Sequence, residues 1–321
     1  MARPSDTATH APDGHPVQVQ REDLLRLRAQ ARSLANRGRI TQRRAVTSPR
    51  EGEFRSLFKG RGMDFEEVRG YQPGDDVRHM DWRVTARTGD PHIKIYREER
   101  ERPIHVLVDL GPSMRFGSRV RFKSVQAARA ATLIAWTARA QGDRIGGVVA
   151  RGERHHELRP MDRDRGVMAL IHALTDLDDG AQSGSEPTDL SASIARMERT
   201  LRPLALAVII SDFIGLNERS EQQLRRLSRH MDLLPVHVFD PLERDTPEPG
   251  AYPVVGPTGP GWLNLDRDAD RRRYSAQYQD RHARLDALFR SIGAPVVHLA
   301  TDDDISHVLG PVLCQGRSLC A

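Results

Sequence analysis

The chain has 321 residues, 38% of them hydrophobic, which is enough for one large or two small domains with a real core. Its only two cysteines, Cys314 and Cys320, lie near the end of the chain, so a disulfide framework is excluded. The longest apolar runs are far shorter than the roughly 18 residues that span a bilayer. Since no basic-then-apolar leader opens the chain either, we expect a soluble, cytoplasmic protein.

The net charge of +5 is unevenly distributed. Residues 21–61 contain twelve Arg or Lys and four Asp or Glu, a net charge of +8, so the rest of the chain is slightly acidic. In the rest of the chain, basic residues mostly alternate with acidic ones, which is typical of a solvated surface. Nucleic-acid binding through residues 21–61 is therefore one functional alternative.

The beginning of the chain predicts a tail followed by a helix. Residues 1–20 lack periodicity and predict a disordered tail. Helical spacing of apolar residues then begins at Glu22 and ends near Gly38. The apolar positions are Leu24, Leu27, Ala31 and Leu34. This helix either packs on the domain that follows it or serves as a partner-binding arm.

Residues 50–102 are dense in charge, glycine and aromatic side chains, and residues 92–96 alternate like a half-buried strand. We group this β-rich lead-in segment with the preceding helix as one region, residues 21–102. Four of its side chains are candidates for partner binding: Arg78, Asp81, Trp82 and Arg87. They either pin the segment in place around a buried tryptophan or form a docking face.

Residues 103–313 alternate between apolar strands and amphipathic helices. Strands are predicted at 104–110, 144–150, 154–159, 204–211, 233–239 and 295–299, and helices at 120–141, 162–177, 189–202, 218–230, 268–292 and 303–313. This alternation predicts an α/β fold with a mostly parallel sheet wound on both sides. Residues 241–266 are an insertion that contains a hairpin, and residues 314–321 are a tail.

Oxygen-bearing side chains follow the two most apolar strands. Asp109 and Ser113 come at and after the end of one strand, and Asp212 follows another. Thr188 lies just before a predicted helix. Ligands bind at the carboxyl edge of open α/β sheets. A set of carboxylates and hydroxyls suits Mg²⁺, so these four residues form a candidate magnesium site.

Two groups of motifs resemble known families. Asp-x-Gly-x-Ser at 109–113, with Thr188 and Asp212, resembles the metal-ion-dependent adhesion site of von Willebrand factor A domains. A second set resembles the signature of domain of unknown function 58, a bacterial family of von Willebrand A-like proteins. It comprises Gly62–Phe65, Val68–Tyr71, Pro73–Arg78, Asp81–Trp82 and Ala86–Thr88. The resemblance covers roughly residues 22–313.

The family resemblance implies a von Willebrand A-like doubly wound sheet in the order 3-2-1-4-5-6, with the site at its topological switch point. It also implies a partnership with MoxR-type AAA+ ATPases, for which such proteins serve as adaptors or cofactors in the maturation of client proteins. The chain departs from the pattern twice. It lacks the amino-terminal membrane helices of many relatives, and Gly111 replaces a serine ligand of the adhesion motif. That glycine either weakens Mg²⁺ binding or serves a turn with positive φ.

We therefore expect a non-enzymatic interaction module with a degenerate adhesion site. The chain contains no Gly-x-Ser-x-Gly elbow, no phosphate-binding loop and no His-Glu-x-x-His motif. A metal-dependent hydrolase is the first alternative to this reading, and nucleic-acid binding is the second.

Overall fold

The computed structural model describes residues 17–37, 63–72, 77, 80–98, 103–178, 188–201, 205–256 and 259–313. The chain divides into two units, one of residues 45–101 and one that contains the rest. The boundary differs from the sequence-based one, because the helix before residue 38 belongs to the larger unit rather than to a region 21–102. Residues 1–16 and 314–321, predicted as tails, lie outside the described residues.

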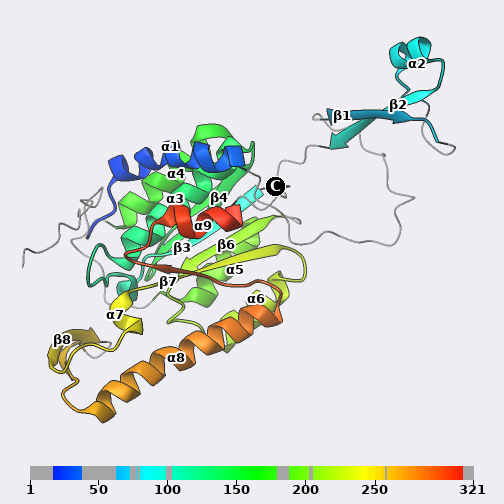
Figure 1. Cartoon of the computed structure of the whole chain (residues 1–321). Helices are drawn as coiled ribbons and strands as arrows, with labels where there is room; N and C mark the ends of the chain where they lie inside the picture. The colour runs from blue at the N-terminus through cyan, green and yellow to red at the C-terminus, as the bar shows by residue number, and fades with distance from the viewer. Residues whose placement is uncertain are drawn as a thin grey trace, which may run out of the picture. The chain divides into compact units, whose positions relative to one another are not determined.

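The larger unit is built on a six-stranded sheet in the order β10-β7-β6-β3-β4-β5 (Figure 1). The strands are β3 (Pro103–Asp109), β4 (Arg144–Arg151), β5 (Arg154–Met161), β6 (Leu206–Ser211), β7 (Asp232–Phe239) and β10 (Val297–Ala300). All neighbours are parallel except β4 and β5, which pair antiparallel at one edge. Renumbered within the sheet, this is the order 3-2-1-4-5-6. The predicted strand order and the mostly parallel α/β fold are therefore confirmed.

Helices cover both faces of this sheet. One face packs against α3 (Lys123–Ala140), α4 (Arg163–Leu177) and α9 (Ile305–Leu313). The other face packs against α5 (Leu190–Thr200), α6 (Glu218–Leu227) and α8 (Asp268–Ser291). Alternate residues of β3 serve the two layers: Val106 and Val108 face the first, and Leu107 faces the second. This two-sided burial explains the continuous apolar sequence of the strand.

Helix α3 begins three residues later than predicted. A Cβ atom at Gly117 would lie 2.1 Å from the backbone oxygen of Arg121, so only glycine lets the chain double back before the helix. From Lys123 onward the alanine-rich helix is buried on nearly every side. Small side chains allow it to lie between the sheet and a further helix.

That further helix is α1 (Arg21–Arg37), whose four predicted apolar residues are all buried. Its Asp23 forms a buried ion pair with Arg129 of α3, and Arg28 contacts Asp164 at 3.0 Å. The packing interpretation of this helix is confirmed. The tail prediction is wrong at its end, because Val19 is buried and its N–H donates to Asp178 at 2.6 Å. Residues 38–61 of the basic segment lie outside the described residues.

The smaller unit contains β1 (Met63–Gly70) and β2 (His92–Glu98), paired antiparallel, and α2 (Trp82–Thr88). Asp81 caps α2 by accepting hydrogen bonds from two backbone N–H groups, at 3.0 and 3.1 Å. Trp82 is 70% exposed, so the interpretation that it is buried is wrong. Arg87 is exposed as well, and Arg78 lies outside the described residues.

The predicted insertion holds a short helix, α7 (Pro241–Arg244), and the predicted hairpin, β8 (Ala251–Gly256) with β9 (Gly259–Asn264). Two apolar side chains of this hairpin are open to solvent, Val254 at 40% exposed and Trp262 at 73% exposed. None of the described helices is both long enough and apolar enough to cross a membrane.

Candidate functional site

The predicted site lies where the neighbouring strands β3 and β6 end. Asp109 is the last residue of β3, and Asp212 directly follows β6. The chain leaves β3 toward β4 and β5 on one side and later returns to β6 on the other. The two carboxylates therefore lie at the topological switch point of the sheet, as expected for a ligand site in this class of fold.

Asp109 is buried and fully hydrogen-bonded. Its Oδ1 accepts from the backbone N–H of Gly111 at 2.8 Å, and its Oδ2 accepts from the Ser211 hydroxyl at 2.9 Å. The Thr188 hydroxyl also bonds this carboxylate. Burial, followed by the negative charge of Asp212, raises the pKa of Asp109 to about 6 despite these bonds. At neutral pH the charged form of Asp109 therefore lowers the free energy of unfolding.

Asp212 has the opposite electrostatic environment. Lys123, the first residue of α3, donates to its Oδ2 at 2.9 Å, and the N–H of Ile214 donates to its Oδ1 at 3.1 Å. Burial is the largest influence and opposes ionisation, but the charge of Lys123 and the hydrogen bonds to the carboxylate together outweigh it and lower the pKa of Asp212. The Ser113 hydroxyl adds a further bond. The predicted site residues Asp109, Ser113, Thr188 and Asp212 are therefore brought together.

Lys123 is a member of the site that sequence analysis missed. Its side chain is 1% exposed, and its ammonium group also contacts Glu243 of α7 at 2.7 Å. Burial would lower the pKa of this lysine, but Asp212 and Glu243 together raise it. The ammonium group thus joins the end of β6 to the insertion.

Glu243 is itself placed by a capping box. Asp240 caps α7 by accepting from the N–H of Leu242, and Glu243 accepts from the N–H of Asp240. The same Asp240 carboxylate accepts from the hydroxyls of Ser118 and Thr301. Burial opposes its ionisation, but these bonds lower the pKa of Asp240. One fully buried carboxylate therefore fixes the loop before α3, the end of β10 and α7.

Gly111 has φ −59° and ψ 173°, so the interpretation that it serves a positive-φ turn is wrong. The reason for glycine is space. A Cβ atom there would lie 2.5 Å from Thr188 Oγ1 and 3.0 Å from Asp109 Oδ1. The Thr188 hydroxyl lies where a side chain at position 111 would begin, and it also accepts from the N–H of Gly152 at 3.1 Å.

We expect Gly111→Ala and Gly111→Ser each to lower the free energy of unfolding by about 1–3 kcal/mol, because the new Cβ must displace the Thr188 hydroxyl. Urea unfolding measures this loss, with a chelator present so that metal binding does not contribute. Only the serine variant adds a ligand oxygen, so it should bind Mg²⁺ more tightly than the alanine variant in calorimetry. Variants as stable as the wild type would contradict the packing argument.

The residues fit a hard divalent cation. Two hydroxyls and two carboxylates converge, and the ammonium group of Lys123 is already shared between Asp212 and Glu243. Burial and then the negative charge of Asp212 raise the pKa of Asp109, and a cation beside this carboxylate would oppose that rise. Lys123 supplies part of what an ion would otherwise supply, so binding should be weak.

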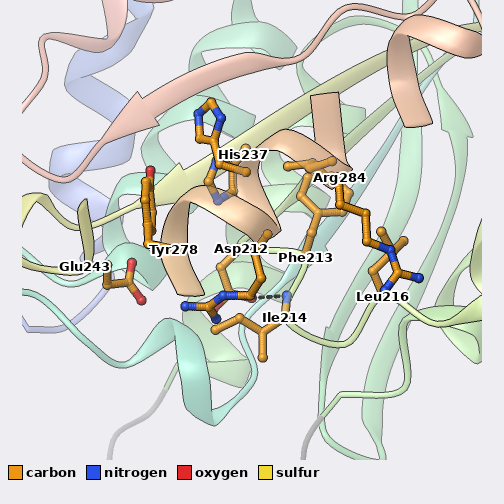
Figure 2. Close-up of a pocket in the computed structure, with 11 residues that line it drawn as sticks. Asp212, Phe213, Ile214, Leu216, His237, Glu243, Tyr278 and Arg284 are labelled. Atoms are coloured by element: carbon orange, nitrogen blue, oxygen red, sulfur yellow. Dashed lines mark hydrogen bonds between the residues drawn. The ribbon is translucent and has the colours of Figure 1, made fainter. Parts of the chain in front are cut away.

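A pocket of about 190 Å³ opens beside Asp212 (Figure 2). Apolar side chains from the loop after β6 and from α8 form much of its wall: Phe213, Ile214, Leu216 and Leu285. Phe213 has a φ of 55°, which is unfavourable for a bulky residue. Its buried ring packs edge-on against that of Phe289, with 5.4 Å between the ring centroids. Ile214 remains 48% exposed at the edge of the pocket.

The family model described as "Protein of unknown function DUF58" matches residues 67–284. The chain belongs to this DUF58 family. It is 31% identical over 298 residues to the uncharacterized proteins Mb1516 of Mycobacterium bovis and Rv1480 of Mycobacterium tuberculosis, with 90% of each chain covered. The crystal structure of the conserved hypothetical protein BatB from Bacteroides thetaiotaomicron is similar at 11% identity, with a TM-score of 0.41. That match covers 66% of this chain and 95% of BatB.

Proposed function

We propose that this DUF58 protein is a non-enzymatic interaction module that acts as an adaptor or cofactor of a MoxR-type AAA+ ATPase in the maturation of client proteins. The observation that supports it best is the composition of the site edge. There an exposed Ile214 adjoins a pocket and carboxylates that already accept hydrogen bonds from protein donors. Binding residues tend to lie on loops held by a rigid sheet. The type of partner comes from the sequence resemblance, whereas the cytoplasmic location that we propose rests on the low cysteine content and the short apolar runs.

Mg²⁺ is an optional part of this proposal. The hydroxyls of Ser113 and Thr188 and the carboxylates of Asp109 and Asp212 would hold the ion. A bound Mg²⁺ would supply positive charge that attracts an acidic side chain of the partner. With no ion bound, Lys123 remains the cation of the site.

The proposal predicts that the surface around Ile214 binds the ATPase. We expect Ile214→Asp to weaken binding of the full-length chain to a purified MoxR-type ATPase from the same genome at least tenfold, because it places a charge in an apolar contact. Biolayer interferometry measures the affinity, and circular dichroism verifies folding. Val254→Asp on the hairpin, at a residue 40% exposed, is the matched control and should bind normally. Equal losses in both variants, or no binding by the wild type, would refute the proposal.

A metal-dependent hydrolase is the second candidate, because a carboxylate with a pKa of about 6 suits a general base. Phosphoester turnover that is present in the wild type and lost in Asp109→Ala would favour this function. Turnover that survives this substitution would come from elsewhere.

A further inference from the structure

Three histidines from separate elements meet where α8 packs on the sheet, and two of them line the pocket beside Asp212. His237 of β7 and His298 of β10 are register partners on neighbouring parallel strands. Their Nδ1 atoms lie 3.0 Å apart. His282 of α8 covers them, and one ring nitrogen from each of the three residues lies within 4.8 Å of the others.

A carboxylate orients two of these rings. Asp286 Oδ1 lies 3.0 Å from His298 Nε2, and Asp286 Oδ2 lies 3.7 Å from His282 Nδ1. Because a carboxylate accepts, the proton of neutral His298 lies on Nε2 and its Nδ1 has a free lone pair. A carboxylate behind a histidine is the usual arrangement around metal-binding imidazoles.

The lone pair of His298 Nδ1 points at His237 Nδ1, and two lone pairs cannot face each other at this distance without a cation between them. Either a proton on His237 Nδ1 fills the gap, or a metal ion does. We propose that His237, His282 and His298 form a binding site for a borderline divalent metal ion, with Zn²⁺ as the best match. Imidazole nitrogens suit Zn²⁺, whereas Mg²⁺ prefers oxygen.

The geometry requires only modest movement of the two strand residues. Zn–N bonds of about 2.0–2.1 Å in a tetrahedral site separate two nitrogens by about 3.4 Å, close to the observed 3.0 Å. His282 has to move closer, and its half-buried ring on α8 is the ligand with most freedom to turn.

The fourth position has room and a polar neighbour. His237 and His282 both line the pocket beside Asp212, so a water molecule can reach the ion. Tyr278 lines the same pocket, and its buried hydroxyl has no hydrogen-bond partner within the part of the chain that the structure describes. A metal-bound water would supply that partner. The site is thus of the open, three-histidine type that keeps one exchangeable position.

The experiment titrates the chelator-treated full-length protein with Zn²⁺ in a calorimeter, and with Co²⁺ while its visible absorption is recorded. We expect one binding site per chain, a tetrahedral Co²⁺ spectrum and a melting temperature that rises with Zn²⁺. His237→Ala and His282→Ala should each weaken Zn²⁺ binding at least 100-fold and abolish the Co²⁺ spectrum. His230→Ala is the matched control, because this histidine is exposed on the loop before β7.

The chain has thirteen histidines, so binding alone does not locate the ion. Unchanged binding in both cluster variants would overturn the proposal, and so would no binding by the wild type. His282→Ala truncates a half-buried helix residue and should fold even where His237→Ala does not. In the metal-free protein, nitrogen NMR should show a proton shared between His237 and His298. Persistence of that signal with saturating Zn²⁺ would also contradict the site.

Discussion

Replacing Lys123 with methionine is expected to lower the free energy of unfolding by about 3–5 kcal/mol, the largest loss predicted for any single substitution in this chain. The side chains of Lys123 and Asp212 are 1% and 3% exposed, so removing the ammonium group leaves a buried carboxylate without its counter-charge. Methionine keeps most of the length of the side chain, so little of the loss should come from a cavity.

Two further measurements separate lost charge from lost packing. In the double variant Lys123→Met, Asp212→Asn the buried carboxylate is gone, and most of the lost stability should return. Arg119→Met is the matched control, because Arg119 also forms an ion pair, with Asp302 at 3.6 Å, but its side chain is 61% exposed. Such a surface pair is worth about 0–1 kcal/mol. If the double variant were as unstable as Lys123→Met, the charge explanation would be wrong.

The sheet could be predicted from the sequence because its signals are local. Strands such as β3 and β6 are continuous apolar runs. A helix that connects two parallel strands of one sheet almost always makes a right-handed crossover, which leaves few possible strand orders. Asp109 and Asp212 were found for the same reason, since each directly follows such a run. The boundary between the two units was not predicted. Helix α1 packs on α3, but in the sequence the whole lead-in segment lies between these two helices.

The ionic partners in the site could not be predicted in this way. Lys123 fits the family pattern in the sequence, but it lies 89 residues from Asp212 and 120 residues from Glu243, and nothing local shows that its side chain reaches either carboxylate. The capping box from Asp240 to Glu243 is readable in the sequence, but it indicates only a helix start. The three histidines beneath α8 likewise come from separate elements and follow no metal-binding spacing.

Asp109→Asn is expected to stabilise the protein at neutral pH by about 1–3 kcal/mol, although it alters a buried residue in the centre of the site. The folded-state pKa of about 6 lies above the ordinary value of 3.8, so the folded protein binds a proton over a range in which the unfolded chain has already lost it. Between these values the free energy of unfolding therefore falls as pH rises. Asparagine removes this penalty and can still accept from the N–H of Gly111.

The pH dependence provides the control. In chelator, the stability difference between Asp109→Asn and the wild type should be largest near pH 8 and shrink as the pH falls through 6 toward 4. A difference that does not change with pH would show that packing rather than charge causes it. Added Mg²⁺ should stabilise the wild type more than the variant at pH 8, because an ion that binds only the folded site shifts unfolding by mass action.

The same substitution tests whether the carboxylate is retained for function. Residues that destabilise a fold are usually retained where binding or catalysis needs them. Asp109→Asn should therefore be more stable than the wild type yet bind the ATPase partner more weakly, in the same interferometry assay as Ile214→Asp. A variant that is more stable and binds equally well would mean that the charge on Asp109 contributes nothing to recognition, and that the apolar surface around Ile214 carries the interaction by itself.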